Sequence, residues 1–219
     1  MDWNFIVQFS ELYKEAALLT IKIAGMGIAG SLIVGFLCGS IRYYKIPVLD
    51  KLTGIYIELS RNTPLLIQLF LLYFGLPRIG IILESETCAI AGLIFLGGSY
   101  MAEAFRSGLE AVEVPQIEAA RSLGFSGWQV FRYVILPQAV AVAVPGIGAN
   151  VIFLIKETSV FSIVALADLM HVAKDLIGLY YKTDEALFML VVSYLIILLP
   201  VSFLFTKLER RLRYAGSGD

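Results

Sequence analysis

The sequence predicts an all-α integral membrane protein with five transmembrane helices, and two observations carry this prediction. Hydrophobic residues make up 58% of the 219 residues and charged residues only 16%, whereas a soluble domain averages about 45–50% apolar and about 25% charged residues. The apolar residues also form long continuous runs, and a helix needs about 20 such residues to cross the hydrocarbon core of a bilayer. A membrane β-barrel would instead show many short segments of alternating polarity, so the sequence favours a helical bundle.

Five runs are long enough to cross the membrane, and together they predict a single transmembrane domain over residues 1–219. They cover residues 16–41, 52–74, 88–105, 134–155 and 186–205. Proline removes a backbone donor from a helix, so we expect a break at Thr63-Pro64 in the second run and an interruption at Pro145-Gly146 in the fourth. The fifth run has no charged residue and is the clearest of the five.

The amino terminus does not resemble a secretory signal, because Met1-Asp2-Trp3-Asn4 lacks the lysine or arginine with which such signals begin. We expect residues 5–13 to lie along the membrane interface before the first span turns inward. Trp3 and Tyr13 suit this level, where amphipathic rings collect.

Lysine and arginine predict the orientation of the chain, because they concentrate in the short cytoplasmic loops of membrane proteins. Most of them follow the first span, lie between the third and fourth, or follow the fifth: Arg42, Lys45, Lys51, Arg106, Arg121, Arg132, Lys207, Arg210, Arg211 and Arg213. Fewer fall on the opposite side: Lys14, Arg78, Lys174 and Lys182. The sequence therefore predicts an outer amino terminus and a cytoplasmic carboxyl terminus.

Composition argues against nucleic-acid, disulfide and metal chemistry. The formal net charge is −1, and the sequence shows no basic stripe of the kind that nucleic-acid binders carry. Cys38 and Cys88 lie in apolar runs and His171 is the only histidine, so we expect no disulfide framework and no metal site. For the segment that holds Asp168, His171 and Lys174, a short amphipathic surface helix is the favoured interpretation, and contact with a partner protein is the alternative.

The stretch between the third and fourth spans, residues 113–133, predicts a short surface helix. Pro115 suits the first turn of a helix and Gly124 suits its end, so the residues between them can form helix. Ala119 and Ala120 are small, and we expect them to let another surface approach closely.

Several motifs carry a resemblance to a known family. Glu118-Ala119-Ala120, then Gly124 and Leu136-Pro137 at this spacing, resemble the EAA loop of permease subunits in bacterial ABC importers, although Val134 stands where the family usually has isoleucine. Three further segments resemble motifs of that family: Glu58 to Leu65, Ser99 to Glu103, and Lys156 to Val160. Together they are similar to the polar amino-acid importers of the histidine, glutamine and arginine type, over nearly the whole chain.

This resemblance implies a type I ABC importer permease fold in the bacterial plasma (inner) membrane. A second permease subunit, expected to be identical, would complete the pathway, an extracytoplasmic solute-binding protein would deliver the amino acid, and a cytoplasmic ATPase dimer would drive transport. Glu118, Ala119, Ala120 and Gly124 would couple the chain to the ATPase. The chain has no Walker motif G-x-x-x-x-G-K-[ST]. ATP and Mg²⁺ would therefore bind the partner, and the chain itself would be no enzyme and need no cofactor. The basic segment 207–213 would anchor the chain on the cytoplasmic side, with the ATPase or anionic lipid as secondary contacts.

Charged residues inside the spans predict a cavity. Ionisable groups at the bilayer centre cost at least about 2.5–3.5 kcal/mol on insertion scales, and they usually face a bundle interior or a watery cavity. Three polar stripes at helical spacing are Glu58, Arg61 and Asn62; Ser99, Glu103 and Arg106; and Asn150, Leu154 and Glu157. The candidate substrate-binding residues are Glu58, Arg61, Asn62, Thr63, Ser99, Glu103, Asn150 and Glu157.

The resemblance to amino-acid importers suggests a role for each charge. Arg61, Asn62 and backbone amides freed by the break would meet the carboxylate of the substrate, and Glu103 and Glu157 would meet its α-ammonium and any cationic side chain. If Glu58 pairs with Arg61, two carboxylates remain, which favours arginine, lysine or histidine over glutamine.

These residues are also compatible with other interpretations. The pairs Glu58–Arg61, Glu103–Arg106 and Lys156–Glu157 could be purely structural, and the same machine could import glutamine or glutamate. An ion-coupled secondary transporter would use the buried glutamates as proton sites, but such folds usually carry paired repeats, and the sequence shows none.

Overall fold

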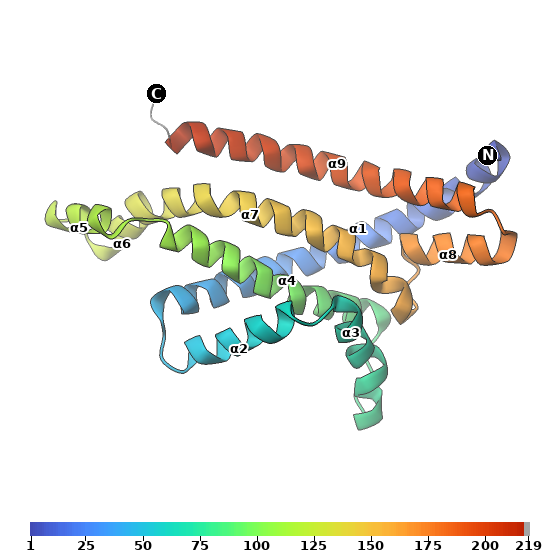
Figure 1. The fold of residues 1–219 in the computed structure, drawn as a ribbon, viewed down its shortest axis with the longest axis horizontal. Coiled ribbons are helices and arrows are strands. Elements are labelled where there is room, and N and C mark those ends of the chain that lie inside the picture. The colour runs from blue at the N-terminus through green and yellow to red at the C-terminus, as the bar shows by residue number, and fades with distance from the viewer. Residues whose placement is uncertain (217–219) are drawn as a thin grey trace.

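The computed structural model describes the backbone of residues 1–216 and the side chains of residues 1–212, and every element in this part of the chain is a helix. Four long helices run along the molecule (Figure 1): α1 (Trp3–Tyr44), α4 (Ser85–Glu110), α7 (Leu136–Glu157) and α9 (Thr183–Gly216). Shorter elements connect them: α2 (Leu49–Arg61), α3 (Leu65–Phe70), η1 (Leu71–Gly75), η2 (Leu76–Ile79), α5 (Val114–Ser122), α6 (Gly127–Val130), η3 (Phe131–Ile135), η4 (Thr158–Val164) and α8 (Leu169–Tyr180). The predicted all-α membrane fold is confirmed. Arg213, which entered the prediction of orientation, lies outside the described side chains.

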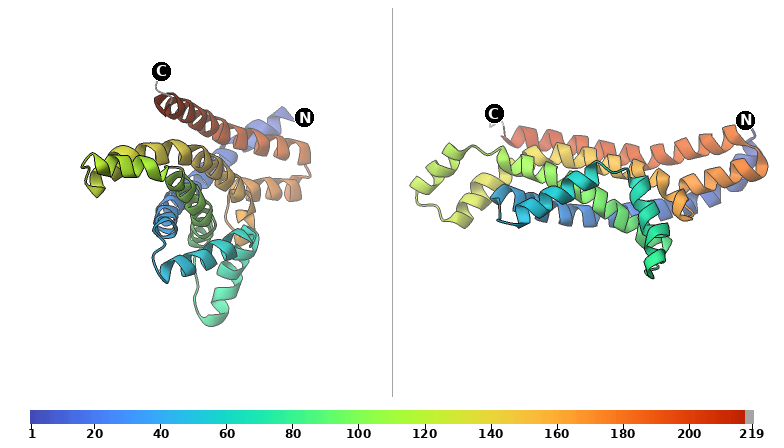
Figure 2. Two further views of the ribbon diagram at one scale, coloured as in Figure 1. Left: turned by 60° about the vertical axis from the view of Figure 1, so that its left-hand side comes forward. Right: turned by 60° about the horizontal axis from the view of Figure 1, so that its bottom comes forward.

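Within the described residues, four helical stretches are long and apolar enough to cross a membrane: Trp3–Tyr44, Ser85–Glu110, Gly127–Val164 and Thr183–Leu212. The second predicted span, residues 52–74, does not form one helix, because the chain breaks between α2 and α3. Its apolar second part, Leu65–Ile79, projects from the side of the bundle (Figure 2). The break expected at Thr63-Pro64 is therefore confirmed.

α1 is one continuous helix of 42 residues, so the prediction of a separate interfacial segment over residues 5–13 is wrong. The Asp2 carboxylate caps the helix by accepting hydrogen bonds from its first backbone N–H groups. Phe5 and Tyr13 are buried against α8 and α9, and Tyr13 Oη donates to the carbonyl oxygen of Ala186 at 2.7 Å. Residues of α8 and α9 therefore cover Phe5 and Tyr13 in this segment.

α7 continues through Pro145, so the predicted interruption at Pro145-Gly146 is wrong. Spanning helices tolerate a proline because neighbouring helices and small local adjustments compensate for the backbone groups that it frees. One helical turn after Pro145, α7 packs closely on α9, since a β-carbon added at Gly148 would lie only 2.7 Å from the Phe205 ring of α9.

Glycines allow α1 to pack closely on α4. A β-carbon added at Gly35 would lie 2.9 Å from the backbone nitrogen of Ala102, and one at Gly27 would lie 2.7 Å from Cβ of Leu93. Small residues let helix backbones approach one another in membranes, where apolar burial drives association less. A β-carbon at Gly25 would instead have no atom within 4 Å.

The two ends of the bundle carry different short helices. The amino terminus, α8 and the start of α9 lie at one end, and α5, α6 and the carboxyl end of α9 lie at the other (Figures 1 and 2).

We expect Gly35→Ala to destabilise the folded chain, because the new methyl group would overlap the backbone of α4. Overpacking of this kind typically costs about 1–3 kcal/mol, so the melting temperature of the detergent-purified protein should fall. Gly25→Ala is the matched control, and its melting temperature should stay unchanged or rise, since alanine favours helix over glycine. Equal melting temperatures for the two variants would contradict the close packing.

Candidate functional site

The chain breaks after α2 because Pro64 cannot continue a helix. Proline lacks an N–H and pushes the preceding residue out of the helical region, and Pro64 itself has an extended backbone with φ −58° and ψ 141°. Gln68 of α3 spans the gap: its Nε2 donates to the carbonyl oxygens of Ser60 at 3.1 Å and Thr63 at 3.0 Å. Carbonyls at the end of a helix lack their helical partners, so Gln68 satisfies two of them and holds the break in one shape.

Hydroxyl groups fix the end of α2 against α4. Ser60 Oγ lies 2.8 Å from the carbonyl oxygen of Phe95 and 3.0 Å from Ser99 Oγ, and Tyr56 Oη donates to the same carbonyl at 2.7 Å. Ser99 is fully buried and donates to the carbonyl oxygen of Leu96. The side chains on both sides of this contact are thus held at a defined position beside the break.

A cavity of about 320 Å³ opens beside the break, between α2, α3, α4 and the end of α7. Its lining residues are Arg61, Asn62, Thr63, Pro64, Leu65, Leu66, Leu96, Tyr100, Phe153, Glu157 and Val160. A second hollow of about 260 Å³ is lined by Ile57, Glu58, Arg61, Asn62 and Tyr100, and so meets the first at three residues. We call the two together the break cavity. Its size suits a small molecule, since such sites measure about 300–1,000 Å³.

Arg61 is the cation that both parts of the break cavity share. Its Nη1 lies 3.9 Å from Oε2 of Glu103, which is close enough for an ion pair and too far for a hydrogen bond. Its guanidinium carbon lies 5.1 Å from the centre of the Tyr100 ring, within the range of a cation–π contact. Within residues 1–212 no guanidinium N–H of Arg61 makes a hydrogen bond, so these donors are free to meet an acceptor in the cavity.

Glu103 is engaged by two arginines. It accepts a hydrogen bond from Arg106 Nη2 at 2.9 Å, which confirms the expected pair, and Arg106 also reaches Glu110 at 3.3 Å. Glu103 does not line the break cavity. It affects the charge of the cavity through its ion pair with Arg61.

The expected pair between Glu58 and Arg61 does not form among the described side chains. Asn62 Nδ2 instead donates to Glu58 Oε2 at 3.2 Å and to the Glu58 carbonyl oxygen at 2.8 Å. Arg61 turns the other way because α4 offers it both a carboxylate and the face of an aromatic ring. Both donors of the Asn62 amide are used in these bonds, so its Oδ1 is the group left for a further contact, as an acceptor.

Glu157 lies across the cavity from the break, at the last position of α7, where it is half-buried. It makes no ion pair with any side chain in residues 1–212. Asn150, earlier on α7, donates to the carbonyl oxygen of Tyr100 at 3.1 Å and lies outside the cavity lining, where it ties α7 to α4.

The break cavity therefore brings together Glu58, Arg61, Asn62, Thr63 and Glu157, and not Ser99, Glu103 or Asn150. Two aromatic residues that were not among the predicted binding residues also line the cavity, Tyr100 and Phe153, and their ring centres lie 5.1 Å apart. Tyr100 lies within the motif Ser99 to Glu103 that resembles the importer family. The position of Tyr100 inside this motif is the sequence signal that could have predicted it as a lining residue.

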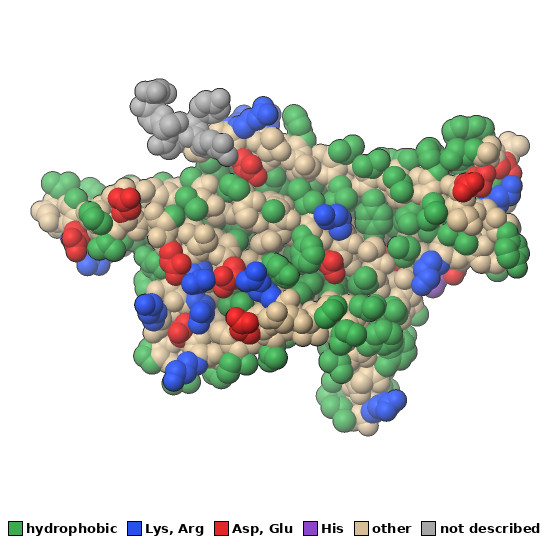
Figure 3. Space-filling model, viewed as in Figure 1, with side chains coloured by type: hydrophobic (Ala, Val, Ile, Leu, Met, Phe, Trp, Pro, Cys, Tyr) green, Lys and Arg blue, Asp and Glu red, His purple; other side chains and the backbone are tan. Residues whose placement is uncertain are grey.

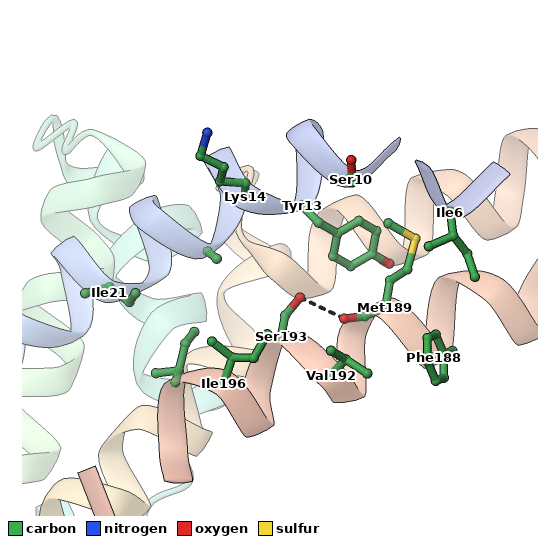
Figure 4. Close-up of a pocket in the computed structure, with 12 residues that line it drawn as sticks. Ile6, Ser10, Tyr13, Lys14, Ile21, Phe188, Met189, Val192, Ser193 and Ile196 are labelled. Carbon is green, nitrogen blue, oxygen red and sulfur yellow. Dashed lines mark hydrogen bonds between the residues drawn. The ribbon is translucent and has the colours of Figure 1, made fainter. Parts of the chain in front are cut away.

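Charged side chains gather over α2 and the adjoining part of α4 on the face shown in Figure 3. A separate hollow of about 350 Å³ between the start of α1 and α9 has a different character (Figure 4). Its lining is mostly apolar, and its charged residue Lys14 is paired with Glu11 at 2.8 Å. This hollow offers a small charged ligand little to bind, so the break cavity is the better candidate site.

α5 and α6 form the tip at one end of the molecule (Figure 2). Glu118 and Ala119 are exposed, but Ala120 is only 6% exposed and packs with Leu109 and Val130. The expectation that both alanines face another surface is therefore wrong for Ala120, because it fills the core beneath α5. Gly124 is exposed beyond the end of α5, in a turn with φ +84°.

α8, at the opposite end, is the amphipathic helix that the sequence predicted around His171. Asp168 caps it by accepting from the His171 N–H at 3.1 Å, and His171 Nε2 lies 3.2 Å from Asp175. Asp168 is fully buried, and one of its carboxylate oxygens has no hydrogen-bond partner among the described residues. Burial raises the pKa of Asp168 to about 6. The cap thus anchors α8 in the protein, whereas the pair of His171 and Asp175 lies at its surface.

Comparison with known proteins identifies the class. The family described as "Binding-protein-dependent transport system inner membrane component" matches residues 31–214. The chain is 33% identical over 214 residues to the glutamine transport system permease protein GlnP of Escherichia coli (strain K12), covering 97% of this chain and 98% of that protein. It is 40% identical over 164 residues to the probable glutamine ABC transporter permease protein GlnP of Bacillus subtilis (strain 168), covering 75% of each.

Solved structures share the architecture. A crystal structure of an amino acid ABC transporter with histidines matches with a TM-score of 0.88 and 31% identity, over 96% of this chain and 99% of that chain. The inward-facing MetNI methionine ABC transporter matches with a TM-score of 0.78 over 94% and 98% of the two chains; at 19% identity it shows the fold alone.

A bundle of spanning helices around a small charged cavity is the architecture of a membrane permease. The chain belongs to the family of binding-protein-dependent transport system inner membrane components, the multi-pass permease subunits of ABC importers, and it has their type I fold. The family resemblance inferred from its motifs is thereby confirmed.

Proposed function

We propose that this chain forms the membrane pathway through which an ATP-driven importer carries a cationic amino acid, namely arginine, lysine or histidine. The charge of the break cavity carries the proposal: Arg61 lines it together with two carboxylates, Glu58 and Glu157, that are not ion-paired within residues 1–212. The names of the relatives and of the solved amino acid transporter support an amino acid as the cargo.

Arg61 would bind the α-carboxylate of the substrate. A guanidinium presents its N–H groups in a fork that matches a carboxylate, and those of Arg61 are not used by the described residues. The Glu103 carboxylate at 3.9 Å balances the arginine when the cavity is empty, and this loose pair leaves the donors available when a substrate arrives.

Glu58 and Asn62 would bind the α-ammonium group. Glu58 lies one helical turn before Arg61, and residues at this spacing are neighbours on the helix surface. A zwitterion placed against this face would therefore meet opposite charges a few ångströms apart. Asn62 Oδ1 adds an uncharged acceptor beside them.

Glu157 would bind the far end of the substrate side chain. Phe153 and Val160 line the same part of the cavity as Arg61 and Glu157, and an apolar wall suits the aliphatic stem of arginine or lysine. A second positive group would balance the second carboxylate. Glutamine is the alternative cargo, favoured by the names of the GlnP relatives; its amide could donate to Glu157 without neutralising it.

α5 would be the coupling helix that docks on a cytoplasmic ATPase dimer, where ATP and Mg²⁺ bind. Glu118, Ala119 and Gly124 are exposed for this contact, and Ala120 would support it from inside. Because the carboxyl end of α9 lies at the same end as α5 (Figure 1), both would face the cytoplasm. The amino terminus and α8 would face the solute-binding protein outside, and a second copy of this chain would complete the pathway.

We expect Glu157→Gln to lower uptake of arginine and lysine about tenfold or more, the effect of losing one hydrogen bond to a charged group, and to leave glutamine uptake nearly unchanged. Glu58→Gln should lower uptake of all three, because every amino acid has an α-ammonium group. The measurement is ATP-driven uptake into proteoliposomes that contain the complete transport system.

Glu15→Gln removes the same charge from an exposed position of α1 outside the cavity lining, and uptake should match the unmodified protein. Equal losses of arginine and glutamine uptake in Glu157→Gln would contradict the cationic assignment. Faster uptake of glutamine than of arginine by the unmodified system would favour the alternative cargo.

We expect Gly124→Val to uncouple ATP hydrolysis from transport. A β-branched residue cannot adopt φ +84° without strain, so the turn that ends α5 would change shape on the docking surface. Stimulation of ATPase activity by the loaded solute-binding protein should be lost while the amount of chain in the membrane stays the same.

Gly124→Asn is the matched variant, because asparagine tolerates the left-handed region, and it should keep most of the stimulation. If both variants lose stimulation equally, the shape of the turn does not carry the coupling. If neither loses it, α5 is not the coupling helix.

A further inference from the structure

The outer face of α9 is the least covered surface among the spanning helices. Only 11% of the apolar stretch of this helix is buried, against 28% or more in the other three. One side of α9 packs inward, where the Phe205 ring meets Gly148 of α7. Another side carries a hollow of about 490 Å³ whose described lining comes from α9: Leu199, Ser202, Phe203, Thr206, Lys207 and Arg210. We call this surface the α9 hollow.

The chemistry of the α9 hollow changes in order along the helix. Its large apolar side chains come first, and both are well exposed, with Leu199 at 61% and Phe203 at 72%. The hydroxyl residues Ser202 and Thr206 come next to Phe203 in the order along the helix. The two cations, Lys207 and Arg210, come last. At 1.5 Å per residue this stripe spans about 16 Å. A phospholipid presents the complementary sequence of acyl chain, glycerol esters and phosphate along the membrane normal.

The cations of the α9 hollow lack internal partners in the part of the chain that the structure describes. Neither Lys207 nor Arg210 forms an ion pair with a carboxylate there, and the Ser202 hydroxyl donates to no other residue within those bounds. Thr206 Oγ1 donates to the carbonyl oxygen of Ser202 at 2.9 Å. Two cations and a hydroxyl that the described residues leave without partners therefore lie beside the exposed ring of Phe203. This positive charge is complementary to an anionic headgroup.

We propose that the α9 hollow binds an anionic phospholipid, with the phosphate on Lys207 and Arg210 and one acyl chain along Phe203 and Leu199. Basic residues at the end of a spanning helix attract anionic lipid, and the chain is a multi-pass inner membrane protein. Under the orientation in the proposed function, this lipid lies in the cytoplasmic leaflet. Binding of the lipid itself does not depend on the proposed substrate.

The test is native mass spectrometry of the full chain, purified in detergent and given equal amounts of phosphatidylglycerol and phosphatidylcholine. The unmodified chain should retain phosphatidylglycerol preferentially. The double variant Lys207→Gln/Arg210→Gln should lose this preference, by about fivefold for each cation removed, and retain phosphatidylcholine as before. Inorganic phosphate should not displace the lipid, since it makes no use of the apolar half of the hollow.

Lys51→Gln/Arg132→Gln is the matched control, because it removes two exposed cations outside the α9 hollow, from the end of the bundle that holds α5. It should keep the preference for phosphatidylglycerol. Equal losses in the two double variants would overturn the proposal in favour of a general effect of net charge. Unchanged retention of phosphatidylglycerol in Lys207→Gln/Arg210→Gln would also overturn it.

Discussion

Arg61 lies at the end of a broken helix, and the break cavity depends on how this one cation is neutralised. Glu103 of α4 lies 3.9 Å from Arg61 and 2.9 Å from Arg106. One carboxylate is therefore shared by two arginines. Charges in spanning helices pair with one another or face a watery cavity, and here both conditions are met: Arg61 is paired loosely and also faces the cavity. Because the Arg61–Glu103 pair is too long for a hydrogen bond, the guanidinium N–H groups can still donate to the carboxylate of a ligand.

The break makes this arrangement possible. A continuous second span would carry its polar residues along one helix face, whereas Pro64 ends the helix and lets α3 leave in a new direction. Gln68 satisfies the carbonyls that the break exposes, and Ser60 fixes the end of α2 to α4. The close approach of α1 and α4, which their glycines permit, supports α4 through residues outside the cavity lining. The break is thus held by Gln68 and Ser60, which do not themselves line the cavity.

The fold and the location of the candidate site could be predicted from the sequence because their signals are local. Apolar runs predict spans, Pro64 predicts a break, and charges in apolar runs predict a cavity. The partners of those charges could not be predicted, since spacing along α2 favours Glu58 for Arg61, while Glu103 and Tyr100 come from a different helix. The burial of Ala120 beneath α5 could not be predicted either, because it depends on tertiary neighbours. The same holds for the continuous helix at Pro145, which packs beside α9.

The most direct measurement concerns the carboxylate that Arg61 is proposed to bind. Ligands that bind the folded state raise its melting temperature, so the permease–ATPase complex can be melted without the solute-binding protein, with arginine or with agmatine, which lacks only the carboxylate. Arginine should raise the melting temperature and agmatine should not, and Arg61→Gln should abolish the effect of arginine. Equal stabilisation by agmatine and arginine in the unmodified complex would contradict the account.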